Sequence, residues 1–278
     1  MRWRLAVLAL LAMGLVWSVG IEPRWVAQRH LQHTVASWQG PPGLKVAVAS
    51  DWHFTRRPFW RVMTAERARG IVAEINAAKP DVVLLPGDLI ASQNDDPDIA
   101  KPEDEIATVL GELRAPLGVY AVLGNHDWWH DAPAIAAALR KKGIAVLEND
   151  AVPLEGTSLW VVGIGDDYTG HSQPRKAIAK LPADAQALVL MHDPASLLEL
   201  PAITGLAVAG HTHGGQVSIP FYGALALPTA APRQWAHGWI DHGPNRMYVT
   251  SGLGVSIFPV RFNMRPEWAL ITINGGTK

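Results

Sequence analysis

The chain has 278 residues, about half of them apolar, so it can build a sizeable core in one large domain with an appendage. Its 24 basic and 25 acidic side chains give a net charge of −1, which excludes the basic field expected of a nucleic-acid-binding protein. The absence of cysteine excludes disulfides and thiolate metal sites. Any transition-metal site must therefore use the 11 histidines with carboxylates or amides.

An apolar segment with a basic flank begins the chain. Residues 5–21 carry no charge, and Ser18 is their one polar side chain. This length is the short limit for a membrane-spanning helix, and Arg2 and Arg4 before it predict that the rest of the chain faces away from the cytosol. A cleaved signal peptide with a weak small-x-small site is the alternative. We interpret residues 1–22 as a membrane anchor or signal segment, and we prefer an uncleaved anchor in the cell inner membrane.

Residues 23–43 lie between this segment and the domain, which we expect to span residues 44–278. They are expected to form a linker or an interfacial segment. Trp25 and Trp38 are typical of a membrane–water boundary, although both could equally pack on the domain. The regular pattern of secondary structure begins only after them, at Lys45.

From Lys45 onward, short β-branched, apolar runs end in polar, glycine-rich turns, which is typical of strands. Several runs are apolar at consecutive positions, which favours strands covered on both faces. Helical patterns lie between them, at 60–78, 103–114 and 132–142. This alternation predicts an α/β domain with a largely central, mixed sheet. The predicted strands are 45–51, 81–88, 119–127, 159–166, 187–194, 205–213, 247–254 and 268–273.

Polar side chains follow five of these strands at the same place, the C-terminal end. Open α/β sheets bind their ligands at this edge, so we expect the side chains to converge. One zinc-type ion takes three or four ligands, so seven ligands are too many for one ion and favour two. The seven candidates are Asp51, His53, Asp88, Asn125, His192, His211 and His213.

The spacing of these residues leaves alternatives open. Asp51 and His53 could reach a common ion, because residues two apart in a strand share a face. His211 and His213 could do the same if their segment stays extended, or they could splay toward adjacent ions. Asp88 could bridge two cations. Each motif alone is as often structural as functional, and only the occurrence of all five in order favours a metal site.

The five motifs are D-x-H, G-D, G-N-H-D, H and G-H-x-H, and in this order they resemble the calcineurin-like metallophosphoesterase superfamily. The resemblance covers residues 45 to about 273 and implies a four-layer α/β/β/α sandwich with mixed central sheets, preceded by the N-terminal hydrophobic helix. GHTHGGQ, the tail SGLGVSIFPVRF with the following RPEW, and the anchor are similar to a bacterial membrane-associated branch. That branch is related to UDP-2,3-diacylglucosamine hydrolases of lipid A synthesis.

The resemblance implies a reaction and a role for each site residue. Two divalent metals, Mn, Fe or Zn with Mn favoured, would activate a bridging hydroxide for in-line attack on a phosphodiester or pyrophosphate. His126 would protonate the leaving oxygen, and Asp127 would hold the His126 imidazole. The implied ligands of one metal are Asp51, His53, Asp88 and His213. Those of the other are Asp88, Asn125, His192 and His211.

The surroundings of the site leave the substrate open. The apolar loop at 214–243 could cover an acyl chain, touch the membrane or pack on the sheet, and Arg56 and Arg57 could meet a phosphate or be solvated. The resemblance suggests a lipid-linked UDP-acyl-sugar precursor of lipid A. An anchor that places the domain outside the cytosol conflicts with such a precursor, so an extracytoplasmic phosphoester is an alternative. A membrane-tethered metal-binding scaffold without catalysis is another.

The stretch GNHDWWHD, residues 124–131, divides in two. Gly124 allows the turn at the strand end, and the catalytic loop is expected to end at Asp127. Asp131 predicts the N-cap of the next helix. One of Trp128 and Trp129 is expected to bury against the sheet, while the other lines the substrate cleft.

Overall fold

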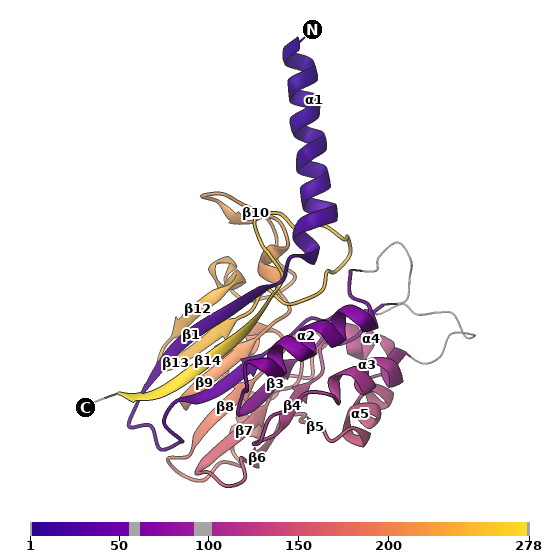
Figure 1. Ribbon diagram of the computed structural model, residues 1–278. Helices are drawn as coiled ribbons and strands as arrows, with labels where there is room; N and C mark the ends of the chain where they lie inside the picture. Colours follow the sequence, from indigo (N-terminus) through magenta and orange to yellow (C-terminus); the bar gives the residue numbers. More distant parts are fainter. Residues whose placement is uncertain (1, 56–61, 92–101, 277–278) are drawn as a thin grey trace.

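Two six-stranded sheets form the centre of the protein, which a computed structural model describes at residues 2–55, 62–91 and 102–276 (Figure 1). Arg56 and Arg57 lie outside these described residues. The first sheet contains β1 (Ala27–Ala36), β2 (Leu44–Val48), β3 (Val82–Pro86), β4 (Val119–Val122), β5 (Ala145–Val146) and β14 (Glu267–Gly276). The second contains β6 (Asp150–Pro153), β7 (Leu159–Gly163), β8 (Gln186–Leu190), β9 (Thr204–Ala209), β12 (Gly238–His242) and β13 (Asn245–Val249).

Both sheets mix parallel and antiparallel pairs. Their strand orders are β1-β14-β2-β3-β4-β5 and β12-β13-β9-β8-β7-β6. β2, β3, β4 and β5 pair in parallel, as do β7, β8, β9 and β13, while β14 runs antiparallel to β2. A separate hairpin joins β10 (Ser218–Ile219) to β11 (Gly223–Ala224). The parallel strands bring their C-terminal ends to one edge, where the polar motifs follow.

Helices cover the outer face of each sheet. The helices are α1 (Arg2–Leu15), α2 (Ala65–Ala77), α3 (Pro102–Leu110), α4 (Asn125–His130), α5 (Ala132–Lys141) and α6 (Pro174–Ile178). α2, α3 and α5 pack on the first sheet (Figure 1), whereas α6 and the short 3-10 turns η4 (Pro194–Leu198) and η6 (Arg233–Ala236) cover the second. This is the four-layer α/β/β/α sandwich that the sequence predicted.

Consecutive apolar residues supply three cores because successive side chains of a strand point to opposite faces. In β2, Ala47 faces the helices, while Val46 and Val48 face the other sheet. In β9, Ala207 faces the outer layer of the second sheet and Val208 faces the core between the sheets. The prediction of strands covered on both faces is therefore confirmed.

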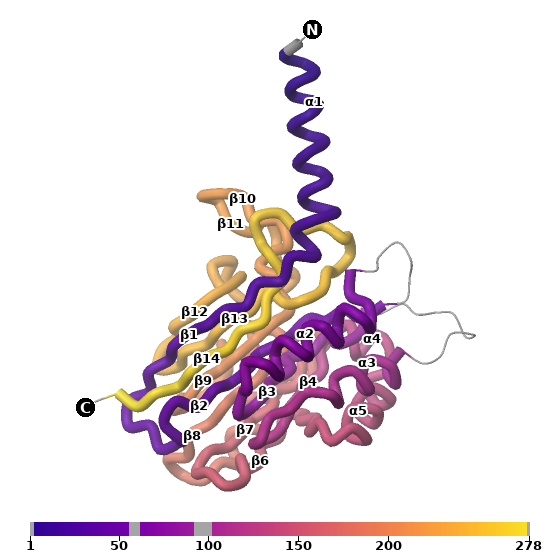
Figure 2. The backbone as a smooth tube through the Cα atoms, viewed as in Figure 1, coloured from indigo at the N-terminus to yellow at the C-terminus, as the bar shows by residue number. Residues whose placement is uncertain are grey.

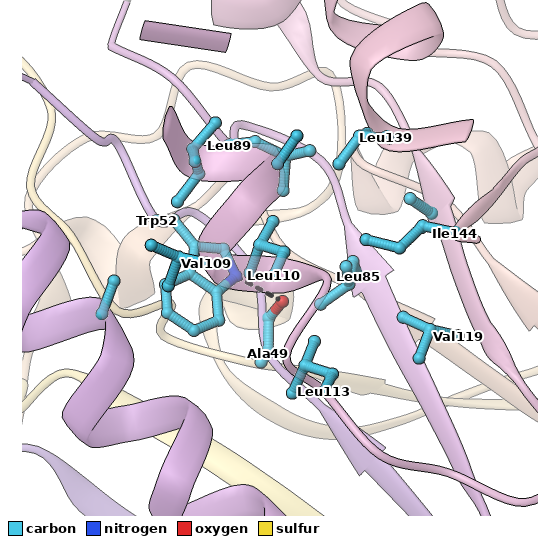
Figure 3. Packing of buried hydrophobic residues seen from close by; sticks show 14 of the residues in the cluster. Ala49, Trp52, Leu85, Leu89, Val109, Leu110, Leu113, Val119, Leu139 and Ile144 are labelled. Carbon is cyan, nitrogen blue, oxygen red and sulfur yellow. Dashed lines mark hydrogen bonds between the residues drawn. The ribbon is translucent and has the colours of Figure 1, made fainter. Parts of the chain in front are cut away.

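A buried tryptophan fixes the chain where β2 ends. Trp52 has no exposed surface and packs among Val109, Leu110 and Leu89 of the helical core (Figure 3). Its indole Nε1–H donates to the carbonyl oxygen of Ala49 over 3.1 Å. The packing and the hydrogen bond hold the segment on either side of Trp52, which carries two of the predicted metal ligands.

Strand β1 replaces part of the linker or interfacial segment expected at 23–43. It pairs in parallel with β14 from Ala27↔Glu267 to Ala36↔Gly276, and Figure 2 shows the two strands side by side. The segment escaped the sequence pattern because it is an edge strand with many polar, exposed residues. Its pairing also extends β14 beyond the predicted 268–273.

The apolar N-terminal helix leaves the domain and continues through a π-helical turn η1 (Val16–Ile21) and a 3-10 turn η2 (Glu22–Arg24). The stretch Trp3–Arg24 is long and apolar enough to cross a membrane, and almost none of it is buried by the domain (Figure 1). A signal sequence has the same properties, so this helix is a candidate anchor by length and composition.

A buried carboxylate joins the two sheets next to β1. Oε1 of Glu267 accepts hydrogen bonds from Tyr248 Oη at 2.7 Å and His237 Nε2 at 2.9 Å, and Oε2 accepts from Arg29 Nε at 2.9 Å. Burial alone would raise the pKa of Glu267, but these donors lower it from 4.5 to about 2. The folded state therefore prefers the ionised carboxylate.

We expect Glu267→Gln to lower the free energy of unfolding at pH 7 by about 2 kcal/mol, because an amide cannot replace the charged acceptor. Since the folded pKa lies below the unfolded value, this contribution is present above pH 4.5 and is lost as the pH falls toward 2. Denaturant unfolding of both proteins between pH 7 and 3 measures the difference. Glu155→Gln, at an exposed turn, is the matched control. A difference that does not depend on pH would contradict the assignment.

Candidate metal centre and active site

The C-terminal ends of five strands meet at one edge of the facing sheets, as the sequence predicted. β2, β3 and β4 come from the first sheet, and β8 and β9 from the second. A hydrogen bond links the sheets here, because Nδ1 of His192 after β8 donates to the carbonyl oxygen of Pro86 in β3 over 2.8 Å. All seven predicted ligands lie at this edge with exposed fractions of 5% or less.

The first group of ligand atoms contains Asp51, His53 and His213. Nε2 of His213 lies 3.0 Å from Nε2 of His53 and 3.5 Å from Oδ1 of Asp51. All three ligand atoms lie within 4.8 Å of one another, so they could hold one metal ion. Two nitrogen atoms and a carboxylate oxygen form a donor set that fits Mn, Fe or Zn.

The second group contains Asp88, His192 and His211, with Asn125 beside them. Nε2 of His192 lies 3.3 Å from Oδ2 of Asp88, 3.1 Å from Oδ1 of Asn125 and 3.1 Å from Nδ1 of His211. Nε2 of His211 donates to the carbonyl oxygen of Pro228 over 2.6 Å, so its Nδ1 lone pair faces the group. Lone pairs and carboxylate oxygens that converge in a buried space are the arrangement that a cation stabilises.

Asp88 lies between the two groups of ligand atoms. Its Oδ2 lies 3.4 Å from Nε2 of His53 and 3.3 Å from Nε2 of His192. A Cβ atom at Gly124 would collide with the Asp88 carboxylate and the His192 ring, so the glycine is required by close approach. The backbone of Gly124 has φ −102°, which residues with a side chain also adopt, so the turn here does not depend on the backbone freedom of glycine.

His211 and His213 point to different groups, which selects the splayed alternative for the G-H-x-H motif. His213 begins the 3-10 turn η5 (His213–Gly215), so the segment is not extended. Five of the seven residues have a positive φ, which side chains with a Cβ rarely adopt and which costs about 1–3 kcal/mol each. They are Asp51, His53, Asp88, His211 and His213. The left-handed backbone at these residues therefore sets the direction of their side chains, and the alternation of side chains along a strand does not.

Burial sets the charge of the site. It lowers the pKa of His53 and of His213 well below the ordinary value, so both rings are neutral at pH 7 and keep a lone pair for a metal. Burial, with the nearby Asp88 carboxylate, raises the pKa of Asp51 to about 6. Two carboxylates in this buried space repel each other, and a divalent cation would offset that repulsion.

His126 lies beside both groups at the start of α4. Its ring packs edge-on against His53 with centroids 4.6 Å apart, and its Nε2 lies 3.3 Å from Oγ of Ser256. With His53 and Asp88 it forms a third group whose ligand atoms lie within 4.8 Å. The position is compatible with proton transfer to a bound phosphoester and also with metal ligation.

Asp127 makes different contacts from those expected. Its Oδ1 accepts from the backbone amides of Leu89 and Ile90 at 3.0 and 3.1 Å, and its Oδ2 accepts from the amide of Gly124 at 3.0 Å. All its hydrogen bonds with described residues thus go to backbone amides and none to the His126 imidazole. The carboxylate holds the loop after β3 against the start of α4, so it positions backbone and does not orient His126.

The GNHDWWHD stretch is helical from Asn125, earlier than expected, and a second helix follows. The predicted N-cap is confirmed, because Oδ1 of Asp131 accepts from the amide of Ala134 over 3.0 Å. The two tryptophans differ in burial, and a role for Trp129 in a substrate cleft stays a prediction. Trp128 packs on the helical core and stacks on His171 with centroids 3.6 Å apart. Trp129 is 55% exposed.

Aromatic rings line one side of the site. Trp129 lies 5.0 Å from the His126 ring and 5.9 Å from Tyr168, and Tyr168 lies 5.2 Å from His211, all between centroids. Tyr168 is half exposed. Sequence reasoning missed Tyr168 because GIGDDYTG contains no ligand motif that includes it.

Three further residues near the site were also missed. Arg261 is fully buried, its guanidinium donates to the carbonyl oxygens of Ser251 and Gly254, and its Nη2 lies 3.2 Å from Nδ1 of His213. The backbone amide of Ser256 donates to Oε1 of Gln216 over 2.6 Å. This bond connects the loop that follows His213 to Ser256, whose hydroxyl contacts His126. Arg261 and Ser256 lie in the tail SGLGVSIFPVRF, whose resemblance was the only signal.

Comparisons with known proteins agree with this geometry. Residues 44–215 match the family described as calcineurin-like phosphoesterase. The chain is 29% identical to the uncharacterized metallophosphoesterase YkuE of Bacillus subtilis over 91% of this chain and 87% of that protein. It is 30% identical to phosphodiesterase YaeI of Escherichia coli, over 91% and 90%. It is also 28% identical to a transmembrane protein with metallophosphoesterase domain of Danio rerio, over 81% and 52%.

The family match covers more than half of the chain, including all seven predicted ligands. Catalysis is therefore favoured over a scaffold role, and the two groups of His and Asp could hold the divalent metals that such a hydrolase needs. The chain belongs to the calcineurin-like phosphoesterase family and is a metal-dependent phosphoester hydrolase.

Proposed function

We propose that the chain is a dinuclear phosphodiesterase or pyrophosphohydrolase that acts at a membrane surface. The observation that carries the dinuclear part is the position of Asp88 between two groups of ligand atoms, with its Oδ2 close to His53 and to His192. One ion would take Asp51, His53, Asp88 and His213. The second would take Asp88, Asn125, His192 and His211.

Two divalent ions at these groups, with Mn as our choice, would acidify the attacking water and neutralise charge on the phosphoryl oxygens. Residues of the protein fix the tautomers and the positions of the predicted ligands before any ion binds. The carbonyl oxygens of Pro86 and Pro228 take the outer imidazole protons of His192 and His211, which fixes both tautomers. The left-handed turns keep the ligands at the strand ends in the absence of substrate.

His126 would donate the proton that the leaving oxygen needs. Its ring lies against the ligand His53, and Nε2 is within hydrogen-bond reach of Ser256 Oγ, which holds the ring in place. Its backbone amide donates to Oδ1 of Asp88 over 2.9 Å, so its distance from the site is fixed as well. Ser256 acts on the reaction through His126 and is a positioning residue.

The substrate is proposed to be an amphipathic phosphoester presented at a lipid surface. The apolar stretch Trp3–Arg24 supports a membrane anchor, and the hydrogen bond from Arg261 N to Ser18 O ties its base to the domain. The basic residues Arg2 and Arg4, in the first turn of α1, favour an orientation with the domain outside the cytosol. A UDP-acyl sugar belongs to this chemical class but conflicts with that orientation, so an extracytoplasmic phosphoester is the alternative, and release of UMP from a UDP-acyl sugar distinguishes the two.

Hydrolysis of bis(p-nitrophenyl) phosphate by the full chain should stop on chelation and return with Mn²⁺, because the site needs cations to bind the phosphoryl group. Elemental analysis of the reloaded protein should find about two metal ions per chain. A protein that binds both ions and hydrolyses no phosphodiester would contradict the proposal.

The matched variants Asp88→Asn and Asp150→Asn distinguish the effect of losing the shared Asp88 carboxylate from the effect of losing one negative charge elsewhere. Asp88→Asn should remove metal from both sites, while the half-exposed Asp150, which pairs with Lys180, lies outside the site, so its variant should keep both ions.

His126→Ala should lower kcat about 10²–10⁴-fold, because the leaving oxygen would lose its proton donor. Metal content, measured on the same sample, should stay unchanged. If metal is lost together with activity, His126 is a ligand of the third group and the proposed role is wrong.

Trp129→Ala should raise KM about tenfold for an aryl phosphodiester and leave kcat nearly unchanged, because the exposed ring offers a stacking face outside the reacting atoms. Steady-state kinetics measure the split. The control is Trp160→Ala, which removes a partly buried ring on β7. A fall in kcat at constant KM would place Trp129 in the chemical step instead.

A further inference from the structure

Large apolar side chains gather around the base of the N-terminal helix. They lie on two loops, residues 219–225 at the β10–β11 hairpin and residues 256–262 before β14, which we call the apolar tips. Both are at the end of the domain from which α1 leaves (Figures 1 and 2). Their exposed large apolar residues are Ile219, Phe221, Tyr222, Leu225, Ile257, Phe258 and Phe262.

Two of these residues stand out. Phe221 is fully exposed and Ile257 is 79% exposed. Both have left-handed backbones, with φ of 68° and 61°, which is a rare conformation for a bulky or β-branched residue. Strain of this kind persists where it serves a function. Single exposed apolar residues are ordinary, but a contiguous group of this size marks an interaction surface.

The apolar tips are connected to each other and to the helix base. The amide of Ser218 donates to the carbonyl oxygen of Phe262 over 2.9 Å, which joins the two loops. The amide of Arg261 donates to the carbonyl oxygen of Ser18 over 2.9 Å, and that of Met264 donates to Oε1 of Glu22 over 2.6 Å. The tips therefore keep a fixed position around the end of the apolar helix.

The chemistry around the tips is that of a lipid–water boundary. Trp17 and Trp25 lie at the helix base, where aromatic belts occur in membrane proteins. The guanidinium of Arg265 lies 3.8 Å from the Trp25 ring centroid, and that of Arg233 lies 4.3 Å from the Tyr222 centroid. Cations at this level can pair with lipid phosphates while the rings below them enter the acyl region.

We propose that the apolar tips are a second membrane contact, inserted into the leaflet that surrounds the base of α1. The occupant is a lipid bilayer, because the surface is continuous with a helix that is itself apolar and almost unburied. This contact is independent of metal binding and hydrolysis.

One consequence rests on the proposed function. Ser256, next to Ile257, bonds His126 through its hydroxyl, so the inserted tip forms part of the wall of the active site. A contact between this tip and lipid would hold the site mouth at headgroup level. The enzyme would then take its phosphoester from the lipid surface and not from bulk water.

The cysteine-free sequence allows a direct test with single probes. F221C, L225C and I257C, each in the full chain, would carry one environment-sensitive NBD fluorophore in phosphatidylcholine–phosphatidylglycerol vesicles. Nitroxide lipids labelled near the headgroup should reduce emission about twofold or more, since such insertion is about 5–10 Å deep. L8C in the helix is the membrane reference, and E155C, at the β6–β7 turn at the far end of the domain (Figure 1), is the aqueous reference.

The outcome at the tips decides the proposal. Thermal unfolding first verifies that each labelled variant is folded, and L225C stands in for F221C if that variant is not. Quenching at a probe on each tip supports membrane contact, whether or not L8C is quenched. Emission equal to that of E155C, or a disulfide between two copies of unlabelled I257C in vesicles, would overturn it. Chelation should not change the quenching, so failure here is distinguishable from failure of the phosphodiesterase proposal.

Discussion

The position of the Asp88 carboxylate depends on two sheets being held face to face. The strand ends that carry the predicted ligands come from both sheets, and the core between the sheets sets their separation. In that core Val48 and Leu84 of the first sheet share one cluster with Leu190 and Val208 of the second. The His192–Pro86 hydrogen bond then fixes the edge where the ligand groups meet. Any change that moves one sheet would separate the two groups around Asp88.

Stability and function compete at this edge. Five ligand-bearing residues adopt left-handed backbones, and several carboxylates and imidazoles are buried without bulk water. Each feature costs folding free energy. The neighbouring contacts offset this cost: Trp52 is packed in the helical core, Asp127 binds three backbone amides, and Arg261 satisfies the carbonyl oxygens of the 251–254 turn. The site is thus held in place by residues that would not touch the substrate.

The sequence was informative where a pattern has a local physical cause. All eight predicted strands are present, because apolar runs buried on both faces have a clear signature. The order of the motifs was enough to select seven candidate ligands, from both sheets, that the fold brings to one edge. β1 was not predicted, since an edge strand is stabilised by pairing with β14 and not by its own composition. The prediction that Asp127 contacts His126 was wrong for a similar reason. Adjacency in sequence suggested His126 as its partner, whereas the fold brings the distant amides of Leu89 and Ile90 closer.

Arg261 links the helix base to the candidate metal centre. Its backbone amide donates to the carbonyl oxygen of Ser18 in the apolar stretch, and its guanidinium lies 3.2 Å from Nδ1 of the His213 ring. Burial lowers the pKa of this guanidinium to about 10, so it remains charged at neutral pH. A displacement of the helix base would therefore be transmitted to a predicted metal ligand through one side chain. The fold couples the position of the apolar helix to the geometry of the site, and this coupling is compatible with the proposed action at a membrane surface.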